Sequence, residues 1–126
     1  HLKHPERFPS VSAFAPICAP SRVPWGRKAF SNYLGNDESQ WARYDSVALI
    51  ESQASKATLL VHQGSDDEVL EEQLKPDLLE AACRDADQAL QLNYCEGYDH
   101  FYYFVASFIE EHMRHHYSAL SEKSGQ

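Results

Sequence analysis

The sequence of 126 residues contains few basic side chains: Lys and Arg number 11 against 19 Asp and Glu, so the formal net charge is −8. Nucleic acids and anionic membrane surfaces attract basic protein faces, because cationic side chains neutralise their phosphate groups. No apolar run approaches the roughly 20 residues that a membrane-spanning helix requires. We therefore expect neither a nucleic-acid partner nor a membrane partner.

Cysteine and methionine are also scarce. Cys18, Cys83 and Cys95 lie far apart, and no CxxC pair occurs, which argues against both a disulfide framework and a zinc ribbon. Reduced thiols are typical of a cytoplasmic protein, which is the location we expect. The one methionine is Met113, and the chain opens on His1 rather than on an initiator residue. We interpret the 126 residues as a piece of a longer protein.

The hydropathy pattern alternates between short apolar runs and segments with helical periodicity. This order indicates an α/β fold with parallel strands joined by crossover helices. Three strands make a small sheet, and one of its edges would need a neighbouring strand. We expect residues 1–120 to form one domain portion and residues 121–126 a flexible tail. The expected strands are 10–15, 58–61 and 89–95, the expected helices are 39–52, 73–86 and 102–120, and residues 18–35 are expected to be a loop.

The long segment 18–35 contains three aromatic residues, Trp25, Phe30 and Tyr33, between prolines and glycines. Loops of this length inside a compact domain are uncommon and are often functional. Its aromatic side chains could form the wall of a pocket. The alternative is a surface cover over the core.

Polar residues follow two of the predicted strands. Gly64-Ser65-Asp66-Asp67 comes after the strand at 58–61, and Gly97-Tyr98-Asp99-His100 comes after the strand at 89–95. Sites in open α/β sheets form at the carboxyl ends of strands, and one βαβ step separates these two loops. We therefore expect His100 to lie near Asp66 or Asp67. An aspartate that orients a histidine supplies two members of a nucleophilic triad, although Gly, Ser and Asp are also ordinary turn residues.

The third member of such a triad is missing from the sequence. No Gly-x-Ser-x-Gly nucleophile elbow occurs, and Ser65 lies on the loop of the acid. Cys18 and Cys95 are conceivable thiol nucleophiles, but no neighbouring residue in the sequence would lower the pKa of either thiol.

A separate group of histidines occupies the last predicted helix. His112, His115 and His116 stand at positions i, i+3 and i+4, so they share one face and could bind Zn²⁺. The alternative is an exposed helix end, where histidines and Arg114 complement the helix dipole.

Five segments of the sequence carry a family resemblance: SVSAFAP (10–16), PWGRKAFSNYLG (24–35), QGSDD (63–67), GYDHFYYF (97–104) and FIEEHMRHH (108–116). Together they resemble the S-formylglutathione hydrolase family, also called the esterase D family. The resemblance extends from Pro5 to about Leu120, and it implies the C-terminal portion of an α/β-hydrolase fold. The order and spacing of PWG-x-KAF, QG-x-D-D and GYDH are specific to this family.

The resemblance implies a cytoplasmic serine thioesterase and carboxylesterase. Such enzymes hydrolyse S-formylglutathione to glutathione and formate during formaldehyde detoxification, and they also cleave short-chain esters. The family's acid matches Asp67, with Asp66 as the fallback, and the family's histidine matches His100. Trp25 matches the segment that helps to wall the acyl pocket. The resemblance implies no metal and no organic cofactor, and it makes a homodimer an expected state.

Two positions depart from the family pattern. Phe101 replaces the serine that usually follows the catalytic histidine, and we expect it to alter the substrate pocket or access to His100. His62 stands where the family usually has an acidic residue. Because the chain lacks the nucleophile, we expect it to be inactive alone. The alternative function is a non-catalytic α/β fragment that binds or pairs with another molecule.

Overall fold

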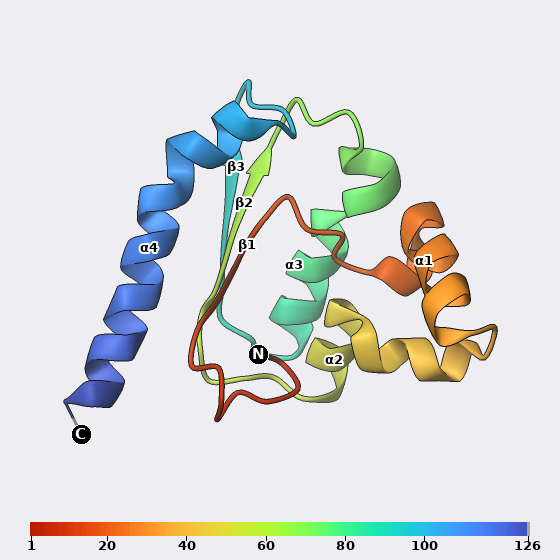
Figure 1. Cartoon of the computed structure of the whole chain (residues 1–126), viewed down its shortest axis with the longest axis horizontal. Helices are drawn as coiled ribbons and strands as arrows, with labels where there is room; N and C mark the ends of the chain where they lie inside the picture. Colours follow the sequence, from red (N-terminus) through yellow and green to blue (C-terminus); the bar gives the residue numbers. More distant parts are fainter. Residues whose placement is uncertain (126) are drawn as a thin grey trace.

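Residues 1–125 are described by a computed structural model, in which three parallel strands form one sheet (Figure 1). The strands are β1 (Val11–Phe14), β2 (Leu59–Gly64) and β3 (Leu90–Cys95), in the spatial order β1-β2-β3. Every residue of the central strand β2 is buried, and its apolar run 59–61 is typical of a parallel strand covered on both faces. The predicted α/β class with parallel strands is therefore confirmed. Strand β2 extends three residues past the predicted run 58–61, so His62, Gln63 and Gly64 belong to it.

Helices cover both faces of the sheet. Helices α2 (Ser46–Ser52) and α3 (Pro76–Asp85) lie on one face, and α4 (Tyr102–Ser124) lies along the other (Figure 1). Each face has its own hydrophobic cluster. The cluster under α2 and α3 includes Ile50, Val61 and Leu79, and the cluster under α4 includes Phe14 and Phe104.

The segment predicted as a loop at 18–35 is mostly helical, so that prediction is wrong. A short 3-10 turn, η1 (Pro20–Arg22), precedes helix α1 (Pro24–Leu34). Pro24 occupies the first helical position, where its fixed φ favours a helix start, and Gly35 ends the helix at a φ of 85°. A side chain at Gly26 would overlap the backbone of Pro20. The same prolines and glycines that suggested a loop therefore begin, pack and end a helix.

The helix predicted at 39–52 is divided into two elements. A 3-10 segment, η2 (Glu38–Tyr44), is followed by Asp45 with extended backbone, and α2 begins at the next residue. The helix predicted from residue 73 begins at Pro76, after a short π-helical turn, η3 (Leu70–Leu74). Lys75 stands between the two elements with a left-handed φ of 47°, which interrupts a continuous helix.

Helix α4 extends through Ser124, beyond the predicted end at Leu120. Residues 121–124 are therefore helical, while Gln126 lies outside the described residues. The division into a domain portion at 1–120 and a flexible tail at 121–126 stays a prediction. No helix within residues 1–125 has both the length and the apolarity needed to cross a bilayer.

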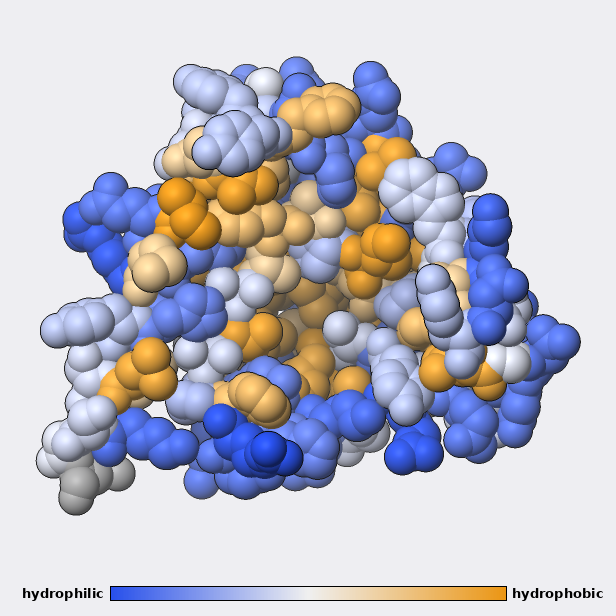
Figure 2. Space-filling view, in the orientation of Figure 1, coloured by the Kyte–Doolittle hydropathy of each residue, from blue (hydrophilic) through white to orange (hydrophobic). Residues whose placement is uncertain are grey.

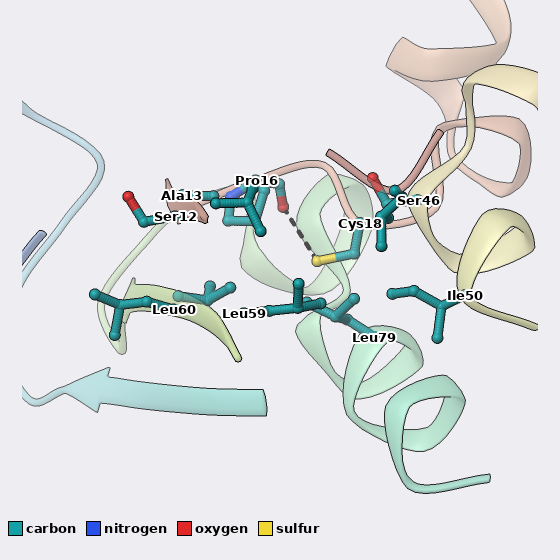
Figure 3. A pocket seen from close by; sticks show the side chains of 12 residues that line it. Ser12, Ala13, Pro16, Cys18, Ser46, Ile50, Leu59, Leu60 and Leu79 are labelled. Carbon is teal, nitrogen blue, oxygen red and sulfur yellow. Dashed lines mark hydrogen bonds between the residues drawn. The ribbon is translucent and has the colours of Figure 1, made fainter. Parts of the chain in front are cut away.

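Strand β1 lies at an edge of the sheet and pairs only with β2 among residues 1–125. Apolar side chains gather in a hollow near the middle of this side of the molecule (Figure 2). An apolar pocket with a cavity volume of about 80 Å³ opens between β1, β2 and the helices α2 and α3. Ala13, Cys18, Ile50, Leu59 and Leu79 are among its lining residues (Figure 3). Neither Asp67 nor His100 lines this pocket.

Candidate active site

The two predicted site loops meet at the carboxyl end of the sheet. The N–H of Ser65 donates to the Cys95 carbonyl at 3.0 Å, and the N–H of Asp66 donates to the Tyr98 carbonyl at 3.0 Å. The N–H of Gly97 donates back to Ser65 Oγ at 2.9 Å. These bonds hold the loop after β2 against the loop after β3.

Gly64 permits this close approach. A Cβ atom at position 64 would overlap the carbonyl of Tyr98, so any larger residue would push the loops apart. Glycine at this position therefore fixes the distance between the loop of Asp67 and the loop of His100.

Asp67 and His100 form a direct hydrogen bond. His100 Nδ1 lies 2.6 Å from Asp67 Oδ2, with the carboxylate side chain fully buried and the imidazole 47% exposed. An ionised aspartate can only accept, so Nδ1 carries the proton in this pair. Nε2 of the neutral ring is then left as a base at the exposed side of the pair.

Two further donors hold the buried carboxylate. The backbone N–H of Val69 donates to Asp67 Oδ1 at 3.0 Å, and the side-chain amide of Gln63 donates to Oδ2 at 3.3 Å. Each carboxylate oxygen thus has a donor besides His100. Asp66 and Glu68 are exposed, and neither bonds to His100, so the geometry favours Asp67 over Asp66 as the acid.

The two predicted pocket residues lie on either side of this pair along the chain. Phe101 is 68% exposed and directly precedes α4, and its N–H donates to Asp99 Oδ1 at 2.9 Å, so Asp99 braces the histidine loop. Trp25 is 51% exposed at the start of α1. Its backbone N–H donates at 2.9 Å to the side-chain carbonyl of Gln73, in the segment that follows Asp67. The pocket roles of both residues stay predictions.

The three thiols are free and buried. Burial, with smaller contributions from nearby acidic groups, raises the pKa of Cys18 to about 12. Burial also raises the pKa of Cys83 to about 11 and raises the pKa of Cys95. Thiols that resist ionisation are poor nucleophiles, so the structure disfavours Cys18 and Cys95 in that role.

The histidines of α4 pack against the sheet, which contradicts the interpretation as an exposed helix end. His112 is buried, its Nε2 lies 2.9 Å from His62 Nδ1, and its ring stacks on Phe14 with centroids 3.8 Å apart. His115 Nε2 bonds the Val11 carbonyl, and His116 bonds the hydroxyls of Ser10 and Ser12. Within residues 1–125 no group of three His, Cys, Asp or Glu side chains is arranged to hold a metal ion.

The sequence analysis named His62 and Gln63 only as parts of family motifs and missed the buried contacts that both make in β2. Gln63 contacts the acid, and His62 lies 3.1 Å from Glu111 Oε2 as well as against His112. The signal was available in the sequence, since two polar residues continue a buried apolar run directly before the site loop.

Two features together define part of an α/β-hydrolase fold. They are a parallel sheet with helices on both faces, and an Asp–His pair on the loops that follow two adjacent strands. The family model of the Esterase family matches residues 1–115, and the chain belongs to that family.

Individual relatives confirm the resemblance to S-formylglutathione hydrolases. The rat (Rattus norvegicus) S-formylglutathione hydrolase is 48% identical over 122 residues, and the Arabidopsis thaliana protein of that name is 45% identical over 121 residues. Each match covers 95% of this chain and 43% of the relative. The structure of an S-formylglutathione hydrolase from Agrobacterium tumefaciens matches 94% of the chain with a TM-score of 0.90 and 44% identity. This chain thus spans 43% of the length of the relatives that it matches.

Proposed function

We propose that this chain supplies the acid and the base of a serine thioesterase and carboxylesterase that hydrolyses S-formylglutathione to glutathione and formate. The observation that carries the proposal is the 2.6 Å bond between His100 Nδ1 and the buried carboxylate of Asp67. The relatives bear the name S-formylglutathione hydrolase, which supplies the substrate class. The nucleophilic serine would come from a polypeptide segment outside these 126 residues.

In the proposed reaction, Nε2 of His100 takes the proton of that serine as its oxygen attacks the thioester carbonyl. Asp67 holds the proton of the ring on Nδ1 and stabilises the imidazolium that forms. The imidazolium then returns its proton to the departing glutathione sulfur, which leaves a formyl-enzyme. Water hydrolyses this ester with His100 again as the base, releasing formate. Trp25 and Phe101 are proposed to wall the pocket around the acyl group.

The proposal is tested with a chimera in which this chain replaces the 43% of the rat S-formylglutathione hydrolase that it matches. We expect the chimera to hydrolyse S-formylglutathione, and Asp67→Asn or His100→Ala to lower kcat by about 10³-fold or more, as changes to triad residues do. Hydrolysis is followed by the absorbance of the thioester bond.

Asp66→Asn is the matched control, because Asp66 is exposed and adjacent to the acid. It should leave kcat within about twofold of the unchanged chimera, as expected for an exposed side chain that does not bond to His100. Equal losses from Asp66→Asn and Asp67→Asn would contradict the assignment of the acid. Turnover of p-nitrophenyl acetate by the 126-residue chain alone, abolished by His100→Ala, would contradict the proposal that the serine lies elsewhere.

The unpaired edge of β1 and the apolar hollow beside it favour a second candidate, a non-catalytic fragment that binds or pairs with another molecule. A folded but inactive chimera would support this candidate over the hydrolase. The cytoplasmic location and the homodimer stay predictions, which cell fractionation and sedimentation of the purified protein can test.

A further inference from the structure

Gln63 is a fully buried polar residue of β2. Its Nε2 donates to the Gly64 carbonyl at 3.1 Å and to Asp67 Oδ2 at 3.3 Å. The reversed orientation of the amide would place its oxygen against two acceptors, so the contacts determine which atom is the nitrogen. The amide therefore directs a donor at the carboxylate that bonds His100.

The other end of the Gln63 amide makes no such bond. Its Oε1 is buried and has no hydrogen-bond partner among residues 1–125. A buried acceptor without a donor lowers stability, whereas an apolar side chain of similar shape would avoid that cost. Gln63 thus orients the Asp67 carboxylate, although an apolar residue at this position would leave no acceptor unsatisfied and would make the strand more stable.

The environment of His100 makes this orientation important. Its ring is 47% exposed, and the bond to Asp67 is the hydrogen bond that restrains it. The plane of the carboxylate is in turn fixed by one donor on each oxygen, Val69 N–H on Oδ1 and Gln63 Nε2 on Oδ2. Removal of the Gln63 donor leaves Oδ2 with the half-exposed His100 ring alone, so the carboxylate is held less firmly, by Val69 N–H on Oδ1 and by His100 itself.

We infer that Gln63 is a positioning residue of the acid–base pair: it holds the Asp67 carboxylate so that His100 keeps its proton on Nδ1. This inference rests on the proposed function for its catalytic consequence. The placement of the proton is a property of the 126-residue chain and does not depend on turnover.

The test compares Gln63→Met with Gln88→Met. Gln88 is also a buried glutamine, but it lies at the amino ends of β2 and β3, away from Asp67 and His100. Its side chain accepts from the N–H of Ser55 and donates to the carbonyls of Ala57 and Ala89. The ring ¹⁵N shifts of His100 in the 126-residue chain report which nitrogen carries the proton. We expect the Nδ1–H form in the unchanged chain and in Gln88→Met, and a mixture of both forms in Gln63→Met.

In thermal unfolding we expect the opposite order of effects from the two variants. Gln88→Met loses three satisfied bonds and should lower Tm more than Gln63→Met, whose loss includes an unsatisfied acceptor. In the rat chimera, Gln63→Met should lower kcat by about 10- to 100-fold with KM within about twofold, because misplacement of the base affects the chemical step. An equal fall in kcat for Gln88→Met would overturn the inference.

Asp67→Asn separates this inference from the proposed function. If Asp67→Asn redistributes the His100 proton and Gln63→Met does not, the positioning role of Gln63 is wrong and the proposed function stands. If the unchanged chain itself shows no preference for Nδ1–H, the Asp67–His100 pair is wrong, and both proposals fail together.

Discussion

The histidines of this molecule have different chemical roles because their surroundings differ. His100 has an exposed ring edge and a buried carboxylate partner, so it can exchange protons with a substrate and still keep its orientation. His112 of α4 is buried against β1 and β2, where it faces Phe14 and His62 and, on its own helix, His115 and His116. Desolvation, with the neighbouring histidines, lowers the pKa of His112 to about 4. Position in the fold thus makes the first a candidate base and the second a neutral packing residue.

The stability of the chain should therefore fall as the pH is lowered from 6.5 towards 4. In the folded state His112 stays neutral down to about pH 4, whereas in the unfolded chain it binds a proton near its ordinary pKa of 6.5. Between these values the unfolded state binds more protons, so acid favours unfolding, by about 2–3 kcal/mol at pH 4.5. Urea denaturation at pH 7, 6, 5 and 4.5 measures this loss.

His112→Phe is the informative variant, because phenylalanine keeps an aromatic ring against Phe14 but cannot bind a proton. We expect a shallower dependence of unfolding free energy on pH in this variant. The same slope in His112→Phe and the unchanged chain would show that His112 does not cause the loss.

At the scale of elements, Asp45 joins two helical segments. Its Oδ2 accepts from the N–H of Ser21 at 3.0 Å and from the Ser21 hydroxyl, and its Oδ1 accepts from the N–H of Ala48 at 3.1 Å. The side chain therefore caps the start of α2 and attaches η1 to it, although it is only 1% exposed. A buried carboxylate with three donors is well satisfied.

Asp45→Ala should lower the free energy of unfolding by about 2–4 kcal/mol, through the lost helix cap and the unsatisfied N–H of Ser21. Asp37→Ala is the control, since Asp37 caps η2 in the same way through Ser39 but lies exposed. Chemical denaturation of both variants should show the larger loss for Asp45. Similar losses of unfolding free energy in the two variants would mean that burial of the Asp45 side chain does not increase its contribution to stability.

These elements show which parts of the structure can be predicted from sequence patterns. The run at 58–61, the alternation at 89–95 and the polar loops after them predicted two strands of the sheet. They also placed Asp66 or Asp67 near His100, because parallel strands end at one edge of a sheet, and the structure shows that Asp67 makes the bond. Asp45 was read as helix interior, although its cap and its bond to Ser21 divide that helix. The pair of His62 and His112 spans 50 residues of sequence, and a local pattern contains no signal for such a contact.

At the scale of the whole molecule, the sheet is open at β1. The apolar hollow beside this strand is lined by residues from the N-terminal segment, β1, β2, α2 and α3. Exposed apolar surface next to an unpaired strand edge favours association with other surfaces.

The 126-residue chain should therefore increase the fluorescence of the dye ANS at neutral pH, because ANS binds exposed apolar surface. Ala13→Lys places a charge on β1 at the hollow and should reduce the signal. Gln91→Lys adds the same charge on the opposite edge strand β3 and should not. Equal signals from the two variants would place the dye elsewhere.

The acid and the base both belong to the contiguous stretch β2–α3–β3, since Asp67 follows the first of these strands and His100 follows the second. Contacts close in sequence form faster than distant ones, because less chain entropy is lost when they close. During synthesis on the ribosome, the bond between Asp67 and His100 can form once residues up to 100 have emerged, before α4 has emerged. The acid–base pair would then assemble early as a local folding unit.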